Sequence, residues 1–313
     1  MSDPSPAHLR TRSDGGRAAE YPPAPEPLRV AVYDNHTHLE IADGALPLDV
    51  HEHLERAASV GIAGAVQVGT DVATSVWSAE VAALEPRLLA AVALHPNEAP
   101  ELEASGSLDD ALSVIDELAA RPRVRAIGET GLDFFRTGED GRGAQFRSFE
   151  AHIEIAKRHG LALQIHDRDA HDDVVSTLRR VGAPDRTVFH CFSGGEELAR
   201  LAADEGWYLS FAGNVTFKNA ENLREALRVA PRDRILVETD APYLTPVPLR
   251  GRPNAPYLVP HTVRFMAGVL GADLDEFCEQ LAANTVAVYG SWQDEPVAGA
   301  PESHDDREGG AAS

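Results

Sequence analysis

The 313-residue sequence predicts an α/β fold of the (β/α)8 TIM-barrel type. Eight short apolar runs have the composition of buried parallel strands, and stretches with helical periodicity lie between them. Polar side chains of the kinds that bind metal ions follow several of these runs at the carboxyl end. Active sites of (β/α)8 barrels lie at that end, so the sequence predicts a barrel that carries a metal site there.

The strand-like runs are short and rich in β-branched residues, as expected for strands that helices cover. They comprise residues 30–33, 65–68, 89–94, 124–127, 161–165, 187–189, 207–211 and 235–237. Helical stretches between them place apolar residues three and four positions apart. The clearest of these comprise residues 50–60, 108–120, 144–158, 172–181, 196–205 and 219–229.

Two histidines one residue apart follow the first strand-like run. In an extended segment, side chains at positions i and i+2 point to the same side, so His36 and His38 can bind one ion. A second pair with the same spacing, His51 and His53, lies in a helical stretch, where the two side chains diverge by about 200°. We therefore interpret the second pair as part of a solvated helix face.

Further candidate ligands follow the fourth, fifth, sixth and eighth runs, and they are Glu129, His166, His190 and Asp240. The barrel topology brings all of these positions to one end. Four histidines and two carboxylates are more than one tetrahedral ion needs. We therefore predict a site for two divalent metal ions, about 3.5–4 Å apart.

Six motifs strengthen this interpretation, at residues 34–38, 94–96, 128–134, 165–170, 190–194 and 237–244. Together they resemble the TatD family of metal-dependent deoxyribonucleases, within the amidohydrolase superfamily, over about residues 29–290. The resemblance implies that His36, His38, Glu129 and Asp240 bind one ion. It also implies that Glu129 bridges to a second ion, which His166 and His190 complete.

One position departs from this family pattern. His152, in the helix after the fourth run, stands where the family more often has glutamine. We expect this helix position to lie away from the metal ions.

The same residues predict the chemistry. Two ions lower the pKa of a shared water, so that hydroxide is available near neutral pH to attack phosphorus. Asp240 is the expected proton acceptor, with Glu129 as the bridging catalytic carboxylate. Glu238 either supports the ligands from behind or pairs with a buried arginine or histidine. The ions are Mg, Mn or Zn, because imidazole ligands favour Zn or Mn and carboxylates also accept Mg.

The expected substrate is DNA or another substrate with a nucleotide end, cleaved at phosphodiester bonds from an end. The net charge of −22 argues against broad, non-specific binding of nucleic acid. A local basic rim remains compatible with it, and the end preference follows from the resemblance and from the scarcity of basic surface. Candidate substrate contacts are His95, Arg136, Arg168, Ser193, Lys218, Arg250 and Arg252. His95 either contacts substrate or caps a loop.

Two other classes of function remain open. Hydroxide attacks carbonyl carbon as readily as phosphorus, so an amidohydrolase acting on a small amide, ester or lactone, or on an aminoacyl-tRNA ester, is the main alternative. A non-catalytic scaffold is disfavoured, because a scaffold has no physical reason to retain six buried metal ligands.

The chain ends differ in composition from the predicted barrel at residues 29–291. Residues 1–28 and the acidic residues 292–313 lack apolar periodicity, so we expect both to be disordered. The sequence shows no secretory signal, no membrane span and no sign of a protein partner. Cys191 and Cys278 lie in different predicted elements and suggest no disulfide, which favours a cytoplasmic location. We expect Cys191 to face away from the site as a buried apolar residue.

Overall fold

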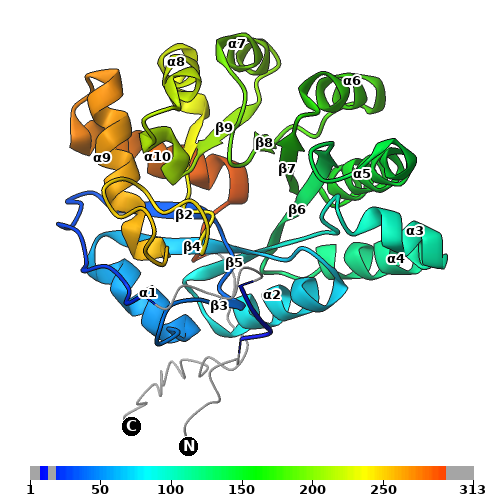
Figure 1. Cartoon of the computed structure of the whole chain (residues 1–313), viewed down its shortest axis with the longest axis horizontal. Coiled ribbons are helices and arrows are strands. Elements are labelled where there is room, and N and C mark those ends of the chain that lie inside the picture. Colours follow the sequence, from blue (N-terminus) through cyan, green and yellow to red (C-terminus); the bar gives the residue numbers. More distant parts are fainter. Residues whose placement is uncertain (1–7, 13–18, 294–313) are drawn as a thin grey trace, which may run out of the picture.

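A computed structural model of the chain describes residues 8–12 and 19–293. Its main sheet has the order β10-β9-β8-β7-β6-β5-β4-β2, and every neighbouring pair is parallel. The strands are β2 (Val32–Thr37), β4 (Ile62–Val68), β5 (Leu88–Val92), β6 (Val124–Asp133), β7 (Ala162–Arg168), β8 (Thr187–Phe189), β9 (Tyr208–Phe211) and β10 (Ile235–Val237). Figure 1 shows helices arranged around the outside of these strands, which confirms the predicted (β/α)8 barrel.

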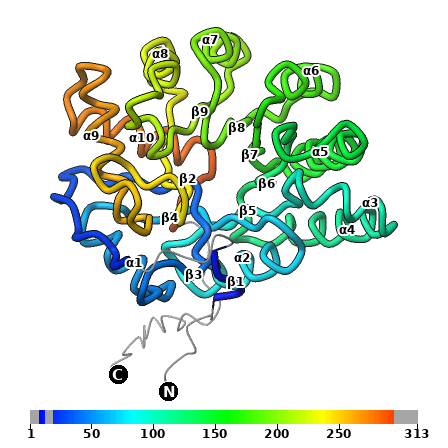
Figure 2. Tube along the Cα trace, viewed as in Figure 1, coloured from blue at the N-terminus to red at the C-terminus, as the bar shows by residue number. Residues whose placement is uncertain are grey.

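Helices follow the strands along the chain. They are α1 (Val50–Ser59), α2 (Val72–Leu84), α3 (Ala99–Ser105), α4 (Leu108–Ala119), α5 (Glu139–His159), α6 (His171–Val181), α7 (Glu196–Asp204), α8 (Glu221–Val229), α9 (Val259–Leu270) and α10 (Leu274–Tyr289). Figure 2, coloured along the sequence, shows the chain passing around the barrel until helix α10 lies beside β2, the first barrel strand. The chain therefore completes the ring before it ends.

Hydrogen bonds between the first and last strands close the barrel at its carboxyl end. The Asn35 side chain donates to the Val237 carbonyl over 2.7 Å. The Thr239 amide donates to the Asp34 carboxylate over 2.8 Å, and Asp34 is fully buried. The Asp240 amide donates to the His36 carbonyl over 2.9 Å. Closure thus fixes the two segments that carry His36 and Asp240 against each other.

Several strands and helices differ from the sequence predictions, and β6 and α2 are the clearest examples. Strand β6 continues to Asp133, six residues past the predicted run 124–127, because it keeps pairing with β7 beyond Gly131. Helix α2 was not among the stretches identified from the sequence. It is apolar on most sides and largely buried, so it lacks the one-sided periodicity that marks a surface helix.

The described N-terminal residues are ordered against the barrel, which contradicts the prediction that residues 1–28 form a disordered tail. Strand β1 (Arg10–Thr11) pairs in parallel with β3 (Ile41–Ala42). Leu28 is buried, and its amide donates to the Val60 carbonyl over 3.0 Å. Residues 1–7 and 13–18 lie outside the described residues.

The C-terminal boundary and the His51–His53 pair also require correction. Trp292 belongs to the core, stacks on Tyr33 at 4.3 Å between ring centroids and donates to the Arg87 carbonyl. The predicted tail at 292–313 therefore begins too early, and residues 294–313 lie outside the described residues. His51 is exposed as predicted, but His53 is buried, so this helix face is not uniformly solvated. Among the described residues, no helix has the length and apolar character needed to cross a membrane.

Candidate metal centre

The two histidines of β2 converge as the extended spacing predicts. Their Nε2 atoms lie 3.2 Å apart. The Nδ1 of His36 donates to the Gln164 side-chain oxygen over 3.1 Å, and the Nδ1 of His38 donates to the Val68 carbonyl over 3.0 Å. Because each Nδ1 has an acceptor, each Nε2 presents its lone pair to the shared space.

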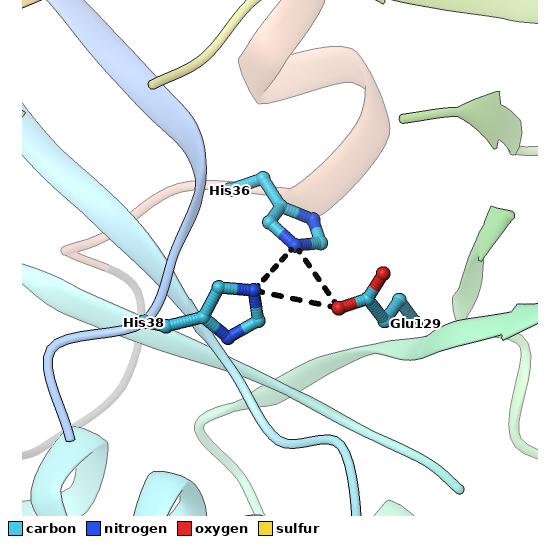
Figure 3. A group of neighbouring side chains, drawn as sticks. All are labelled: His36, His38 and Glu129. Atoms are coloured by element: carbon cyan, nitrogen blue, oxygen red, sulfur yellow. Dashed lines mark hydrogen bonds and ion pairs between the residues drawn. The ribbon is translucent and has the colours of Figure 1, made fainter. Parts of the chain in front are cut away.

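Glu129 lies between two sets of histidines. Its Oε1 is 3.4 Å from the Nε2 of His38 and 3.7 Å from the Nε2 of His36, as the dashed lines in Figure 3 show for these three residues. Its Oε2 is 2.9 Å from the Nε2 of His190 and 3.2 Å from the Nδ1 of His166. One carboxylate oxygen therefore faces each pair, which is the arrangement a bridging ligand requires.

The histidines of the second pair are also oriented by carboxylates. The Nδ1 of His190 lies 3.3 Å from the Glu238 carboxylate, and the Nε2 of His166 lies 3.3 Å from the Asp133 carboxylate. An acceptor on the outer nitrogen again turns the inner nitrogen's lone pair toward Glu129. Glu238 thus pairs with a buried histidine that is itself a candidate ligand. It therefore fits both interpretations that the sequence left open, support of a ligand and pairing with a buried histidine.

Asp240 completes the first group from the opposite side. Its Oδ1 lies 3.7 Å from the Nε2 of His38 and 3.9 Å from the Nε2 of His36. The residue has a φ of +53°, in the left-handed region that aspartate tolerates better than most residues. The backbone at this position therefore bends out of the β10 direction and places the carboxylate beside the β2 histidines.

The carboxylates of the cluster demand positive charge. Burial alone would raise the pKa of Glu129, but the charges of His190 and His95 and a hydrogen bond from His166 hold it well below its usual range. Burial opposes protonation of His190, yet the Glu129 charge raises the pKa of His190 to about 10. The pKa of His38 is also raised well above its usual range, against burial, by Asp240 and Glu129. Divalent cations would supply this charge in place of protons.

The donor set fits metal binding on chemical grounds. Imidazole and carboxylate atoms lie within 4.8 Å of one another in the group His36, His38 and Glu129, and also in the group His95, Glu129 and His166. Mixed nitrogen and oxygen donors suit Zn or Mn. A third group with the same spacing comprises His36, His190 and Glu238. The residues therefore fit divalent cations, and Glu129 is common to the first two groups.

The predicted rim residues divide into two sets. His95, Arg136, Arg168 and Ser193 line a cavity of about 610 Å³ above the candidate ligands. This volume lies in the range of sites for small-molecule ligands, so the cavity is large enough to hold a nucleotide. His95 also accepts a hydrogen bond from the Asn97 amide, so it combines the loop-capping and rim positions.

The other predicted basic contacts lie away from the cavity lining among the described residues. Lys218 is exposed, and Arg250 is stacked 3.7 Å over the Phe217 ring. Arg252 donates from its side chain to the Glu20 carbonyl over 2.8 Å, so it binds the N-terminal segment. The structure therefore does not bring these three residues of the predicted basic rim to the cavity lining: Lys218 lies in the segment after β9, and Arg250 and Arg252 lie in the loop after β10.

The structure also brings to the cavity three residues that were not among the predicted site residues, Cys191, Asp133 and Arg10. Cys191 lines the cavity, contrary to expectation, because its φ of +42° ends the strand alternation immediately after His190. Asp133 accepts from Asn97 over 3.2 Å and from the Arg136 amide over 2.9 Å in addition to its contact with His166. Its position four residues after Glu129, on the same strand and thus the same side, was the available signal. Arg10 also lines the cavity, from a segment that the sequence did not connect with the site.

Comparisons with known proteins agree with this arrangement. A family model described as "TatD related DNase" matches residues 33–290. The chain is 43% identical over 262 residues to an uncharacterized metal-dependent hydrolase, TatD, of Mycobacterium tuberculosis, covering 82% of this chain and 97% of the relative. It is 35% identical to the uncharacterized metal-dependent hydrolase YcfH of Escherichia coli K12, over 82% of this chain and 94% of the relative. The crystal structure of the TatD homologue YjjV of Escherichia coli superposes with a TM-score of 0.74 at 25% identity, covering 83% of this chain and 98% of that chain.

Proposed function

The chain belongs to the TatD family of metal-dependent hydrolases, and on this basis we propose that it cleaves phosphodiester bonds of DNA from an end, using two divalent cations. The observation that carries the proposal is the position of Glu129, with one carboxylate oxygen toward the His36–His38 pair and the other toward the His166–His190 pair. When bound there, two cations lower the pKa of a water they share and stabilise charge on a phosphoryl oxygen.

The protein side chains divide the remaining work. His36 and His38 are locked by Gln164 and the Val68 carbonyl, so they hold their geometry without rearrangement. Asp240 lies beside them with 15% of its side chain exposed, and it is the carboxylate placed to accept a proton from the attacking water. The same carboxyl group then returns the proton to the leaving oxygen of the substrate.

Arg136 and Arg168 supply positively charged guanidinium groups at the cavity mouth. Arg168 is stacked 3.9 Å over the Phe135 ring, and 62% of Phe135 is exposed. A guanidinium that stacks on a ring is already held in one orientation. Arg168 therefore loses less side-chain entropy on binding phosphate than a freely rotating arginine would. The overall acidity of the chain and the limited cavity volume favour an end of the DNA over an internal bond.

We also propose a reducing, cytoplasmic setting. Cys191 and Cys278 are both free thiols. Persistent free cysteines are typical of compartments that keep thiols reduced.

The test is cleavage of a 5′-labelled single-stranded DNA oligonucleotide by chelator-treated protein, with Mg, Mn or Zn restored separately. We expect a ladder of products that requires metal and that is lost in Asp240→Asn, by about 100-fold or more. The ladder also reveals the end from which cleavage proceeds. If metal-loaded protein leaves DNA intact but hydrolyses small esters or lactones, the site is a carbonyl hydrolase and the phosphodiesterase proposal is wrong.

A further inference from the structure

An N-terminal segment outside the family match reaches the active-site cavity. Residues 8–12 run beside the chain that follows His38: the Leu9 amide donates to the Glu40 carbonyl over 3.0 Å, and the Arg12 amide donates to the Ala42 carbonyl over 3.2 Å. The family model begins at residue 33. The segment therefore lies outside the matched region and is attached by backbone hydrogen bonds at the edge of the site.

Arg10 is the residue of this segment that enters the cavity lining. Its Nη2 donates to the Glu40 carboxylate over 2.7 Å and to the Thr70 hydroxyl over 3.1 Å. Both contacts use Nη2, so Nη1 makes no hydrogen bond among the described residues; 38% of the side chain is exposed, whereas Nε is buried. The guanidinium thus retains donors for an anion from the cavity after its contacts with the protein are made.

The position of Glu40 places Arg10 beside the metal centre but not in it. The Glu40 carboxylate is fully buried and lies 3.7 Å from the Nδ1 of His38, the ring nitrogen that points away from Glu129. Arg10 approaches Glu40 from the solvent side. It is therefore separated from the reacting centre by a carboxylate and an imidazole ring, which is too remote to bind the bond being cleaved.

Arg10 also lies on a different side of the barrel mouth from the other cavity arginines. Its partners Glu40 and Thr70 follow β2 and β4, which are neighbours in the sheet. Arg168 is the last residue of β7, and Arg136 lies three residues after the end of β6. The candidate ligands lie between these two cationic sides, so a nucleotide chain placed across the mouth meets a cation on each side.

We propose that Arg10 binds a second phosphate of the substrate, next to the phosphodiester that is cleaved, and that residues 8–12 are therefore part of the substrate site. This inference rests on the proposed function. It makes Arg10 a specificity residue that favours substrates with two phosphates over substrates with one. Arg10 neutralises Glu40 through Nη2 alone. A purely structural role therefore does not explain why the remaining donors of Arg10 face the cavity.

The test compares two substrates in wild type and Arg10→Gln: a thymidine dinucleotide with one phosphodiester and a thymidine trinucleotide with two. Loss of a charge-assisted hydrogen bond should raise KM for the trinucleotide by about 10- to 100-fold, with less than a threefold change for the dinucleotide. Arg29→Gln is the matched control, because it removes one positive charge from a side chain that is 87% exposed and ion-paired with Asp275. This control should leave both KM values unchanged.

Two further measurements separate binding from structure. Protection of the Leu9 and Arg12 amides from hydrogen exchange reports whether the segment stays attached in Arg10→Gln. If it detaches, Arg10→Lys decides instead, since it keeps the charge and should retain most of the preference for the trinucleotide.

Equal changes for both substrates, or none for either, would overturn the role of Arg10 while leaving the nuclease intact. Wild-type protein that cleaves neither nucleotide with any metal would overturn the proposed function, and with it this inference. The two failures are thus distinct.

Discussion

Replacement of Glu238 by glutamine should weaken one of the two proposed cation sites selectively. Glu238 is fully buried, and its Oε1 accepts from the His190 ring at 3.3 Å and from the Cys191 amide at 2.7 Å. Glutamine preserves an acceptor oxygen and the shape of the side chain. It removes the negative charge that makes the His190 ring more basic and therefore a stronger metal ligand. Loss of such a supporting contact typically lowers metal affinity by 10- to 100-fold, or about 1.4–2.7 kcal/mol.

The assay is calorimetric titration of stripped protein with Zn, which resolves two binding steps when the two affinities differ. We expect the loss in the step assigned to His166 and His190, with the His36–His38 step changed by less than about threefold. Glu98→Gln is the control, since Glu98 lines the same cavity and its removal changes the net charge equally. An equal loss in both steps, or the same loss in the control, would refute the reasoning that Glu238 acts through His190.

Three further outcomes are expected. His152 is buried and accepts a hydrogen bond from the Leu94 amide, and burial lowers its pKa to about 4. Because the unfolded chain binds this proton near pH 6.5, the free energy of unfolding should fall by about 3 kcal/mol as the pH falls from 6.5 to 4. His152→Gln should remove this part of the pH dependence of the free energy of unfolding, measured from urea unfolding curves at several pH values. An unchanged pH dependence in the variant would contradict the role of His152. Arg252→Ala removes side-chain bonds to the Glu20 and Tyr21 carbonyls and should cost about 1–2 kcal/mol in thermal unfolding with kcat unaltered; a fall in kcat would place Arg252 back at the site. A chelator should abolish hydrolysis and restored Mn or Zn should recover it, whereas activity that survives chelation would exclude a metal requirement.

The candidate metal ligands were predictable because the ends of buried strands can be recognised from the sequence. His36, His38, Glu129 and Asp240 follow or terminate apolar runs, and parallel strands in a barrel end at one place. The structure brings all four together within 3.9 Å contacts, as the alternation of strand and helix requires. Local patterns were sufficient here, since each residue's position along its own strand determined its side of the barrel.

The rim was less predictable because it depends on loop paths. Arg250 and Arg252 follow β10 in sequence, but the loop turns them away toward Phe217 and the N-terminal segment. Cys191 enters the cavity through a left-handed backbone conformation that no strand alternation predicts. Arg10 reaches the site from thirty residues before its partner Glu40, through backbone pairing of short strands. Composition alone suggested that its segment was disordered.

The proposed two-cation centre is tested most directly by native mass spectrometry of the full chain reloaded with Zn, compared with Glu129→Ala. Because Glu129 offers one oxygen to each histidine pair, wild type should bind two ions per chain and the variant should lose both or retain only one at low occupancy. Wild-type protein that binds a single ion, or a variant that still binds two, would contradict the bridging role of Glu129 and the mechanism that depends on it.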